Sequence, residues 1–153
     1  MSVKLNCMTS TPQPLDSDWG QFTRGPYSSE DGTEYFEQYY LLPGRPDLVL
    51  QTPDRHLAAK LIKVLQAALY ELDDRQRTAS DAVVGAFSGG ARPTPSELDE
   101  AAEDLVLETI VAHSDKTVVF HFKDSCEEHF LPGSWPAVRM NAAGEVLEVW
   151  LDS

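Results

Sequence analysis

The stretch LVLETIVAHSDKTVVFHF, residues 105–122, determines how the second half of this chain is expected to fold. Two runs rich in β-branched and aromatic residues, 105–112 and 116–122, flank a short polar turn, which predicts a β-hairpin. A second hairpin is predicted further on, where PAVRMN (136–141) and EVLEVWL (145–151) flank the turn AAG. The C-terminal part of the chain is therefore expected to end in an antiparallel meander.

A helix is predicted immediately before the meander, over residues 95–104. Thr94 and Glu97 form a T-x-x-E capping box, and the intervening Pro95 suits the first helical position. The outward face of this helix carries Glu97, Glu100, Glu103 and Asp104. The helix dipole favours acidic residues in the first turn but opposes them in the last turn. The dipole therefore explains Glu97, while the acidic last turn calls for another explanation.

The N-terminal half is predicted to contain a hairpin and helices. EYFEQYYLL (34–42) reads as one strand with Phe36, Tyr40 and Leu42 toward the core, and DLVLQ (47–51) is expected to pair back after the turn PGRP. A binding platform formed by the tyrosines is the less favoured alternative. Leucines and alanines at spacings of three and four then predict a long amphipathic helix over 53–72.

Three further expectations concern the ends of these elements. Thr52 is predicted to cap the long helix, with Pro53 at its first position. Residues 73–87 are expected to form a second, shorter helix. SGGARP (88–93) is predicted to be a flexible break in the chain. The segments before and after it need each other's apolar faces to form a core, so a single domain is expected.

The fold class predicted from these elements is α+β. An antiparallel sheet, made of the N-terminal hairpin and the C-terminal meander, carries the long helix and one or two shorter ones. The length of 153 residues fits a single domain over 1–153. Residues 1–18, with few large apolar groups, are expected to form a loosely held arm, docked through Leu5 or Leu15.

The charge of the chain is strongly negative and unevenly distributed. The formal net charge is −13, and residues 94–153 carry 13 acidic and 3 basic side chains. Such a field repels nucleic acids and anionic membranes and attracts a basic protein partner. The competing interpretation is that the charge only aids solubility. No apolar run approaches the roughly 20 residues of a membrane span, and free cysteines at 7 and 126 fit a reducing cytoplasm.

The stretch FKDSCEEHF, residues 122–130, contains residue types found in catalytic and metal sites. A nucleophilic Cys126 paired with His121 or His129 is disfavoured, because neighbouring carboxylates raise a thiol's pKa. A zinc site from these three residues lacks any supporting Cys-x-x-Cys or His-x-x-x-His pair. The sequence therefore predicts no metal, cofactor or catalytic residue. An acid/base pair of Glu127 and Glu128 stays open as an alternative.

A partner-binding surface is the interpretation that fits these residues best. An acidic loop held between two strands is a common recognition element, and Trp135 at its exit has the character of an interface anchor. If this loop and the acidic helix face the same way, they form one negative patch. The residues predicted to bind a partner are Glu100, Glu103, Asp104, Asp124, Glu127, Glu128 and Trp135.

The segment VVFHFKDSCEEHFLPGSWPAVRMNAAGEVLEVW, residues 118–150, resembles the C-terminal end of immunity proteins, small bacterial domains encoded beside polymorphic toxins. These proteins often end in a strand, a Cys-containing acidic E-E-H-like loop and a hairpin with a Gly turn. The resemblance covers about a fifth of the chain, while PGSWP and the N-terminal half match nothing in that class. It implies a non-enzymatic, cytoplasmic protein that binds and neutralises a basic toxin or effector. The alternatives are a small carboxylate-dependent hydrolase and an acidic mimic or adaptor acting on a nucleic-acid-binding protein.

Overall fold

The centre of the structure is a six-stranded sheet with the order β10-β9-β8-β7-β6-β5. In this computed structural model, the described residues are 14–23, 26–28, 34–36, 39–125, 130 and 133–152. Within them, three helices accompany the sheet and two small two-stranded sheets, so the predicted α+β class is confirmed. The strands of the large sheet are β5 (Tyr40–Leu42), β6 (Asp47–Gln51), β7 (Leu105–His113), β8 (Val118–Asp124), β9 (Trp135–Met140) and β10 (Val146–Asp152).

The predicted C-terminal meander is confirmed. β7 pairs with β8, β8 with β9 and β9 with β10, and each pair is antiparallel. The predicted hairpin of β5 and β6 is also present, with Tyr40 opposite Leu50. All these pairings join strands that follow one another in the chain, which is why local patterns were sufficient to predict them.

One pairing differs from the expected antiparallel sheet. β6 and β7 run parallel, with Asp47 opposite Thr109 and Leu50 opposite Ala112, so the sheet is mixed. Parallel neighbours need a crossover that returns the chain to the same end of the sheet, and here three helices provide it. The helices therefore do more than cover the sheet, because they also join its two halves.

The prediction of a single strand over residues 34–42 is wrong. β4 (Glu34–Phe36) pairs with β3 (Pro26–Ser28) in a separate small sheet, whereas β5 belongs to the large sheet. Residues 37–38 and the side chain of Phe36 lie outside the described part of the structure. The predicted faces of β5 are confirmed: Tyr40 is buried and Leu42 packs against the main core.

Part of the predicted N-terminal arm is ordered. β1 (Leu15–Ser17) pairs with β2 (Gly20–Phe22), and Leu15 and Phe22 are both buried in the main core. The prediction that Leu15 anchors this segment is confirmed, but residues 15–17 form a strand rather than a loose arm. Residues 1–13, including Leu5, lie outside the described residues.

The first helix is shorter than predicted and begins later. α2 (Arg55–Tyr70) has 16 residues, about 24 Å, so a long helix over 53–72 is not confirmed. Asp54 rather than Thr52 is the cap, because its Oδ1 accepts hydrogen bonds from the N–H groups of His56 and Leu57. Thr52 Oγ1 instead accepts from the Asp54 N–H, at 3.1 Å, which supports the cap one step earlier. The predicted second helix is present as α3 (Leu72–Ala86).

The capping box of the third helix, α4 (Pro95–Asp104), is confirmed. Thr94 Oγ1 accepts from the Glu97 N–H at 3.2 Å, and Glu97 Oε1 accepts from the Thr94 N–H at 3.0 Å. These bonds stabilise the ionised carboxylate, so the pKa of Glu97 lies below its ordinary value of 4.5. The start of α4 is therefore firmly fixed.

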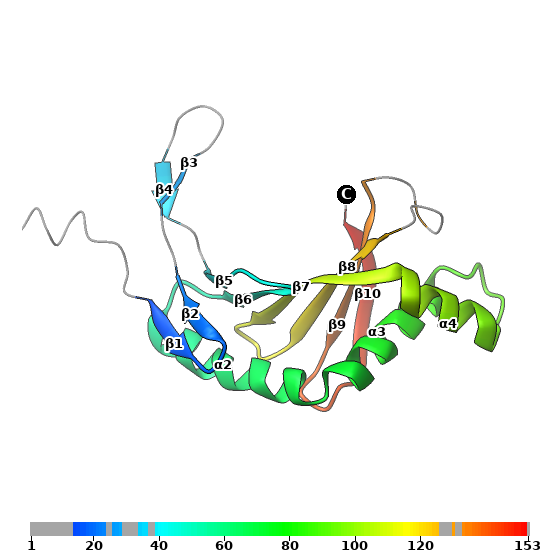
Figure 1. Cartoon of the computed structure of the whole chain (residues 1–153), viewed down its shortest axis with the longest axis horizontal. Coiled ribbons are helices and arrows are strands. Elements are labelled where there is room, and N and C mark those ends of the chain that lie inside the picture. The colour runs from blue at the N-terminus through cyan, green and yellow to red at the C-terminus, as the bar shows by residue number, and fades with distance from the viewer. Residues whose placement is uncertain are drawn as a thin grey trace, which may run out of the picture.

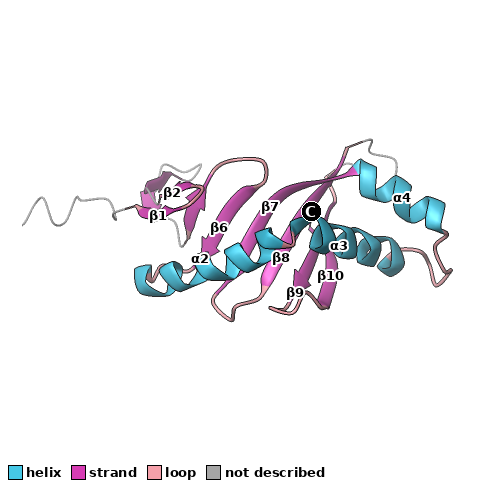
Figure 2. Ribbon diagram, turned by 60° about the horizontal axis from the view of Figure 1, so that its bottom comes forward, coloured by secondary structure: helices cyan, strands magenta, loops and turns pink. Residues whose placement is uncertain are grey.

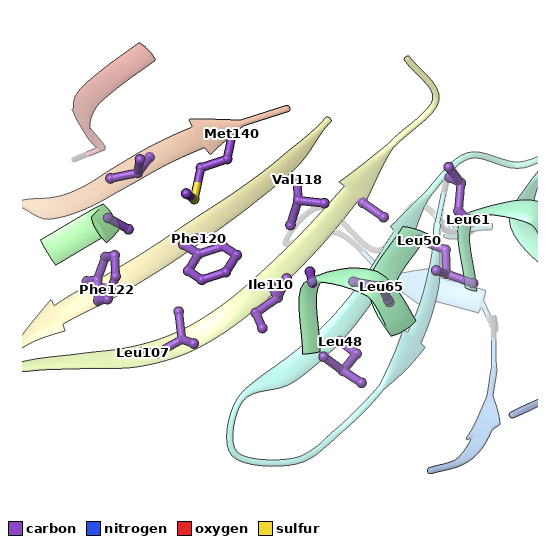
Figure 3. Close-up of a cluster of buried hydrophobic side chains, with 14 of the residues drawn as sticks. Leu48, Leu50, Leu61, Leu65, Leu107, Ile110, Val118, Phe120, Phe122 and Met140 are labelled. Atoms are coloured by element: carbon purple, nitrogen blue, oxygen red, sulfur yellow. The ribbon is translucent and has the colours of Figure 1, made fainter. Parts of the chain in front are cut away.

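The main core lies between one face of the sheet and the helices. α2 and α3 lie along the same side of the sheet (Figures 1 and 2). Figure 3 shows Leu61 and Leu65 of α2 beside strand residues that include Leu50, Ile110 and Phe120. On the opposite face, a smaller buried cluster consists of Val49, Val111, Val119 and Ala137, partly covered by Tyr39, Leu41 and Trp150.

This second face carries His121 of β8, Arg139 of β9 and Trp150 of β10. Neither α2 nor α3 covers it (Figure 1). Among the described residues, no helix is both long and apolar enough to cross a membrane.

Candidate partner-binding surface

The end of α4 and the start of the segment after β8 lie side by side. The Ser125 N–H donates a hydrogen bond to the Asp104 carbonyl oxygen at 2.9 Å. Leu105, the first residue of β7, stands opposite Asp124, the last residue of β8. The sequence had left open whether the acidic helix and the acidic loop are near each other, and this contact places the beginning of the loop at the helix end.

Two of the predicted residues on α4 are exposed and belong to a surface. Glu100 and Glu103 are exposed, and Asp104 is half-buried. No basic residue stands in the last turn of α4. The helix dipole therefore adds to the negative potential at this end.

A neighbouring carboxylate on α4 has a different role. Asp99 Oδ1 accepts a hydrogen bond from Arg77 Nη2 at 2.8 Å, and Arg77 Nε also donates to Asp81 at 2.8 Å. Arg77 thus ties α4 to α3, and these bonds hold its pKa above the ordinary value. Asp99 therefore forms an ion pair within the molecule, whereas Glu100 and Glu103 are exposed to solvent.

Asp124 does not belong to the exposed surface predicted for it. Only 5% of this residue is exposed, and its Oδ2 accepts a hydrogen bond from the Phe130 N–H at 3.1 Å. The Phe130 ring in turn packs edge-on against Phe87 at the end of α3, with the ring centroids 5.6 Å apart. Asp124 therefore has a structural role, because its buried carboxylate binds the N–H of Phe130.

Glu127 and Glu128, the other acidic residues predicted to bind a partner, lie outside the described residues. The same is true of Cys126 and His129, which formed part of the disfavoured nucleophile and zinc sites. Within the described ranges, no group of three or more His, Cys, Asp or Glu side chains could hold a metal ion.

Trp135 borders a shallow hollow at the same end of the sheet. It is the first residue of β9, stands opposite Asp152 of β10 and is 43% exposed. The hollow has a volume of about 310 Å³ and lies on the face away from α2 and α3. Its lining consists of Glu108, Thr109, Val111, His121, Phe122, Trp135 and Asp152.

Two acidic residues of this hollow were not among the predicted ones. Glu108 is exposed, and Asp152 is half-buried. Strand alternation was the signal that could have found them: Glu108 alternates with the buried Leu107, and Asp152 alternates with Leu151 on the edge strand.

A hydrogen-bonded group of side chains forms the floor of the hollow beside Trp135. Asp152 Oδ1 accepts from the indole Nε1–H of Trp150 at 2.9 Å, and Asp152 Oδ2 lies 3.4 Å from His121 Nδ1. Burial lowers the pKa of His121 despite the raising effect of Asp152, so the imidazole is neutral at pH 7. The contact is then a long hydrogen bond between a neutral ring and a carboxylate.

This His121–Asp152 pair resembles part of a catalytic triad but lacks the third member. A triad requires a nucleophile hydrogen-bonded to the histidine. No Ser, Thr or Cys within the described ranges makes such a bond to His121.

The two histidines of this face make the stability of the fold dependent on pH. Burial lowers the pKa of His113 and His121 below the ordinary value of 6.5. As the pH falls below 6.5, the unfolded chain binds protons that the folded chain does not, so the free energy of unfolding should decrease. Urea unfolding between about pH 7.5 and 5.5 measures this effect above the range in which carboxylates titrate.

The matched variant for this measurement is His113→Gln/His121→Gln. It removes both groups and should show a flatter dependence on pH over the same range. An unchanged dependence in the double variant would assign the effect to other groups and contradict this account.

No family model, curated protein or solved structure significantly matches the chain.

Proposed function

We propose that this chain is a cytoplasmic, non-enzymatic binding protein of the immunity type, which holds and neutralises a basic toxin or effector. The proposed binding surface comprises the exposed carboxylates of Glu100, Glu103 and Glu108 together with Trp135, and is called the acidic end below. The observation that carries the proposal is the hydrogen bond from Ser125 to Asp104. It joins the acidic helix to the acidic segment that begins at Ser125.

The chemistry of this surface suits a basic protein. Carboxylates at the rim of an interface steer a positively charged partner and raise the association rate, particularly at low salt. A partly exposed tryptophan offers a large apolar area with few rotatable bonds, which is typical of residues that dominate binding energies. The net charge of −13 extends this attraction over the whole molecule.

The test is a charge reversal that separates the acidic end from net charge. The partner is isolated by affinity capture from the source cell and purified, and its association with Glu100→Lys/Glu103→Lys is measured at low and high salt. We expect the association rate constant to fall by about tenfold at low salt, and the loss to shrink at high salt.

Asp16→Lys/Asp18→Lys is the matched control. Both residues are exposed on or beside β1, far along the sheet from α4, and this variant has the same net charge as the test variant. The control should change the rate constant by less than about twofold. Equal losses in the two variants would reduce the effect to net charge and overturn the acidic end as the binding surface.

Trp135→Ala probes the anchor separately from the charge. Its effect should appear mainly in the dissociation rate, with affinity reduced about thirtyfold, as for an interface residue that contributes about 2 kcal/mol. A partner that is not basic would contradict the proposal. So would turnover of a hydrolase substrate by the purified chain that is lost in Glu128→Gln.

A further inference from the structure

A basic hollow lies on the far side of the molecule from the acidic end. It has a volume of about 540 Å³ and lies where α2 meets the turns after β7 and after β9. Figure 1 shows the turn between β9 and β10 beside the junction of α2 and α3. Four cationic side chains line it, namely Lys60 and Lys63 from α2, Arg75 from α3 and Lys116 from the turn after β7.

This concentration of positive charge is unusual for such an acidic chain. The sequence contains 12 lysines and arginines against 25 acidic residues, and four of the 12 converge on this hollow. Within the described ranges, Lys60, Lys63 and Lys116 form no ion pair. Asp115, which directly precedes Lys116 in the sequence, accepts hydrogen bonds from the Thr117 N–H and hydroxyl instead.

Arg75 forms a buried part of the wall. Only 8% of this residue is exposed, and its Nη2 donates to the Ala142 carbonyl oxygen at 3.0 Å. Glu71 is 3.6 Å away, and Arg75 Nε is buried without a hydrogen-bond partner. A buried charge with so little compensation is costly, and an anion bound nearby would offset part of that cost.

The remaining lining of the hollow is apolar. Val64 and Ala67 follow Lys60 and Lys63 at helical spacing along α2, and Val118 begins β8 on the opposite side. An apolar floor with cations around it suits a ligand that has an apolar body and an anionic group. The volume lies within the roughly 300–1,000 Å³ that small-molecule sites occupy.

We propose that this hollow binds a small organic phosphate, with its apolar group on Val64, Ala67 and Val118 and its phosphate between Lys60, Lys63 and Lys116. Ammonium groups bind phosphate as mobile point charges, and Arg75 contributes a fixed positive charge behind them. The site does not depend on the acidic end, which has the opposite charge and lies on other elements.

The test uses three probes of defined chemistry at low ionic strength. 1-Naphthyl phosphate has both the ring and the phosphate, inorganic phosphate has only the anion, and 1-naphthol has only the ring. Calorimetry should show saturable binding of 1-naphthyl phosphate, with the other two at least about tenfold weaker. Methyl resonances of Val64 and Val118 should shift with the same saturation curve.

Variants of the full chain then assign the contacts. Lys60→Ala/Lys63→Ala removes two exposed charges and should weaken the binding of 1-naphthyl phosphate by about tenfold or more. Lys116→Ala should weaken this binding by a smaller factor. Lys123→Ala, an exposed lysine on β8 outside the hollow, is the control and should change affinity by less than about twofold.

The proposal would be overturned by the absence of saturable binding, by equal binding of the double variant and the wild type, or by shifted resonances that lie outside the hollow. Equal affinity for 1-naphthol would also overturn it, since the cations would then play no part.

Discussion

Replacing Phe120 by alanine is expected to lower the free energy of unfolding by about 3–5 kcal/mol. Phe120 is fully buried in β8, where it stands opposite Ile110 of β7 and Val138 of β9. Its ring lies 6.5 Å from that of Phe122, and Figure 3 places both in the core that α2 covers. Removing the ring would leave a cavity between the paired strands and the helices packed on them, and close-packed neighbours fill such a cavity only in part.

Urea unfolding followed by circular dichroism measures this loss. Tyr70→Ala is the matched control, because Tyr70 is an aromatic residue at the end of α2 that is 89% exposed. Its replacement should change stability by less than about 0.5 kcal/mol. A loss below about 1 kcal/mol for Phe120→Ala would contradict the packing of β8 at the centre of the core.

The second large effect is expected at Asp124. Asp124→Ala should lower the free energy of unfolding by about 2–3 kcal/mol, because it removes a buried carboxylate that accepts the Phe130 N–H. Phe130 is half-buried, so its N–H would be only partly compensated by water after losing this partner. The contact of Phe130 with Phe87 should weaken too, since the hydrogen bond holds the backbone that carries the ring.

Asp124→Asn separates the hydrogen bond from the charge. The amide oxygen can still accept from Phe130, so this variant should retain more stability than Asp124→Ala. Hydrogen exchange of the Phe130 amide is the direct readout and should be faster in Asp124→Ala than in Asp124→Asn. Unchanged stability and exchange in Asp124→Ala would show that the bond does not hold this segment.

The elements that could be predicted from the sequence are those defined by neighbouring residues. The C-terminal hairpins combine alternating apolar residues with short polar turns, and the capping box of Thr94 and Glu97 lies within one helical turn. The parallel pairing of β6 and β7 could not be predicted in this way. This pairing depends on the end of the sheet at which β7 begins after the three helices, and no short segment of sequence determines that position.

Other differences arise where two local signals compete. Thr52 and Asp54 are both good caps, and the structure uses Asp54 as the cap while Thr52 supports it. Residues 34–42 form one aromatic-rich run in sequence but contribute to two sheets. Asp124 was predicted to bind a partner as part of the acidic loop, yet it is buried and accepts a hydrogen bond from the Phe130 N–H.

The parallel pairing of β6 and β7 also has a consequence for the order in which the chain is completed on the ribosome. β5, β6 and α2 emerge before β7, so one edge of β6 has no neighbour until β7 has been synthesised. β6 itself carries Leu48, Val49 and Leu50, which are all buried in the finished molecule. An unpaired apolar strand of this kind is prone to join a wrong neighbour. Chaperones are therefore expected to matter most during the period of synthesis in which β6 is complete but β7 has not yet been made.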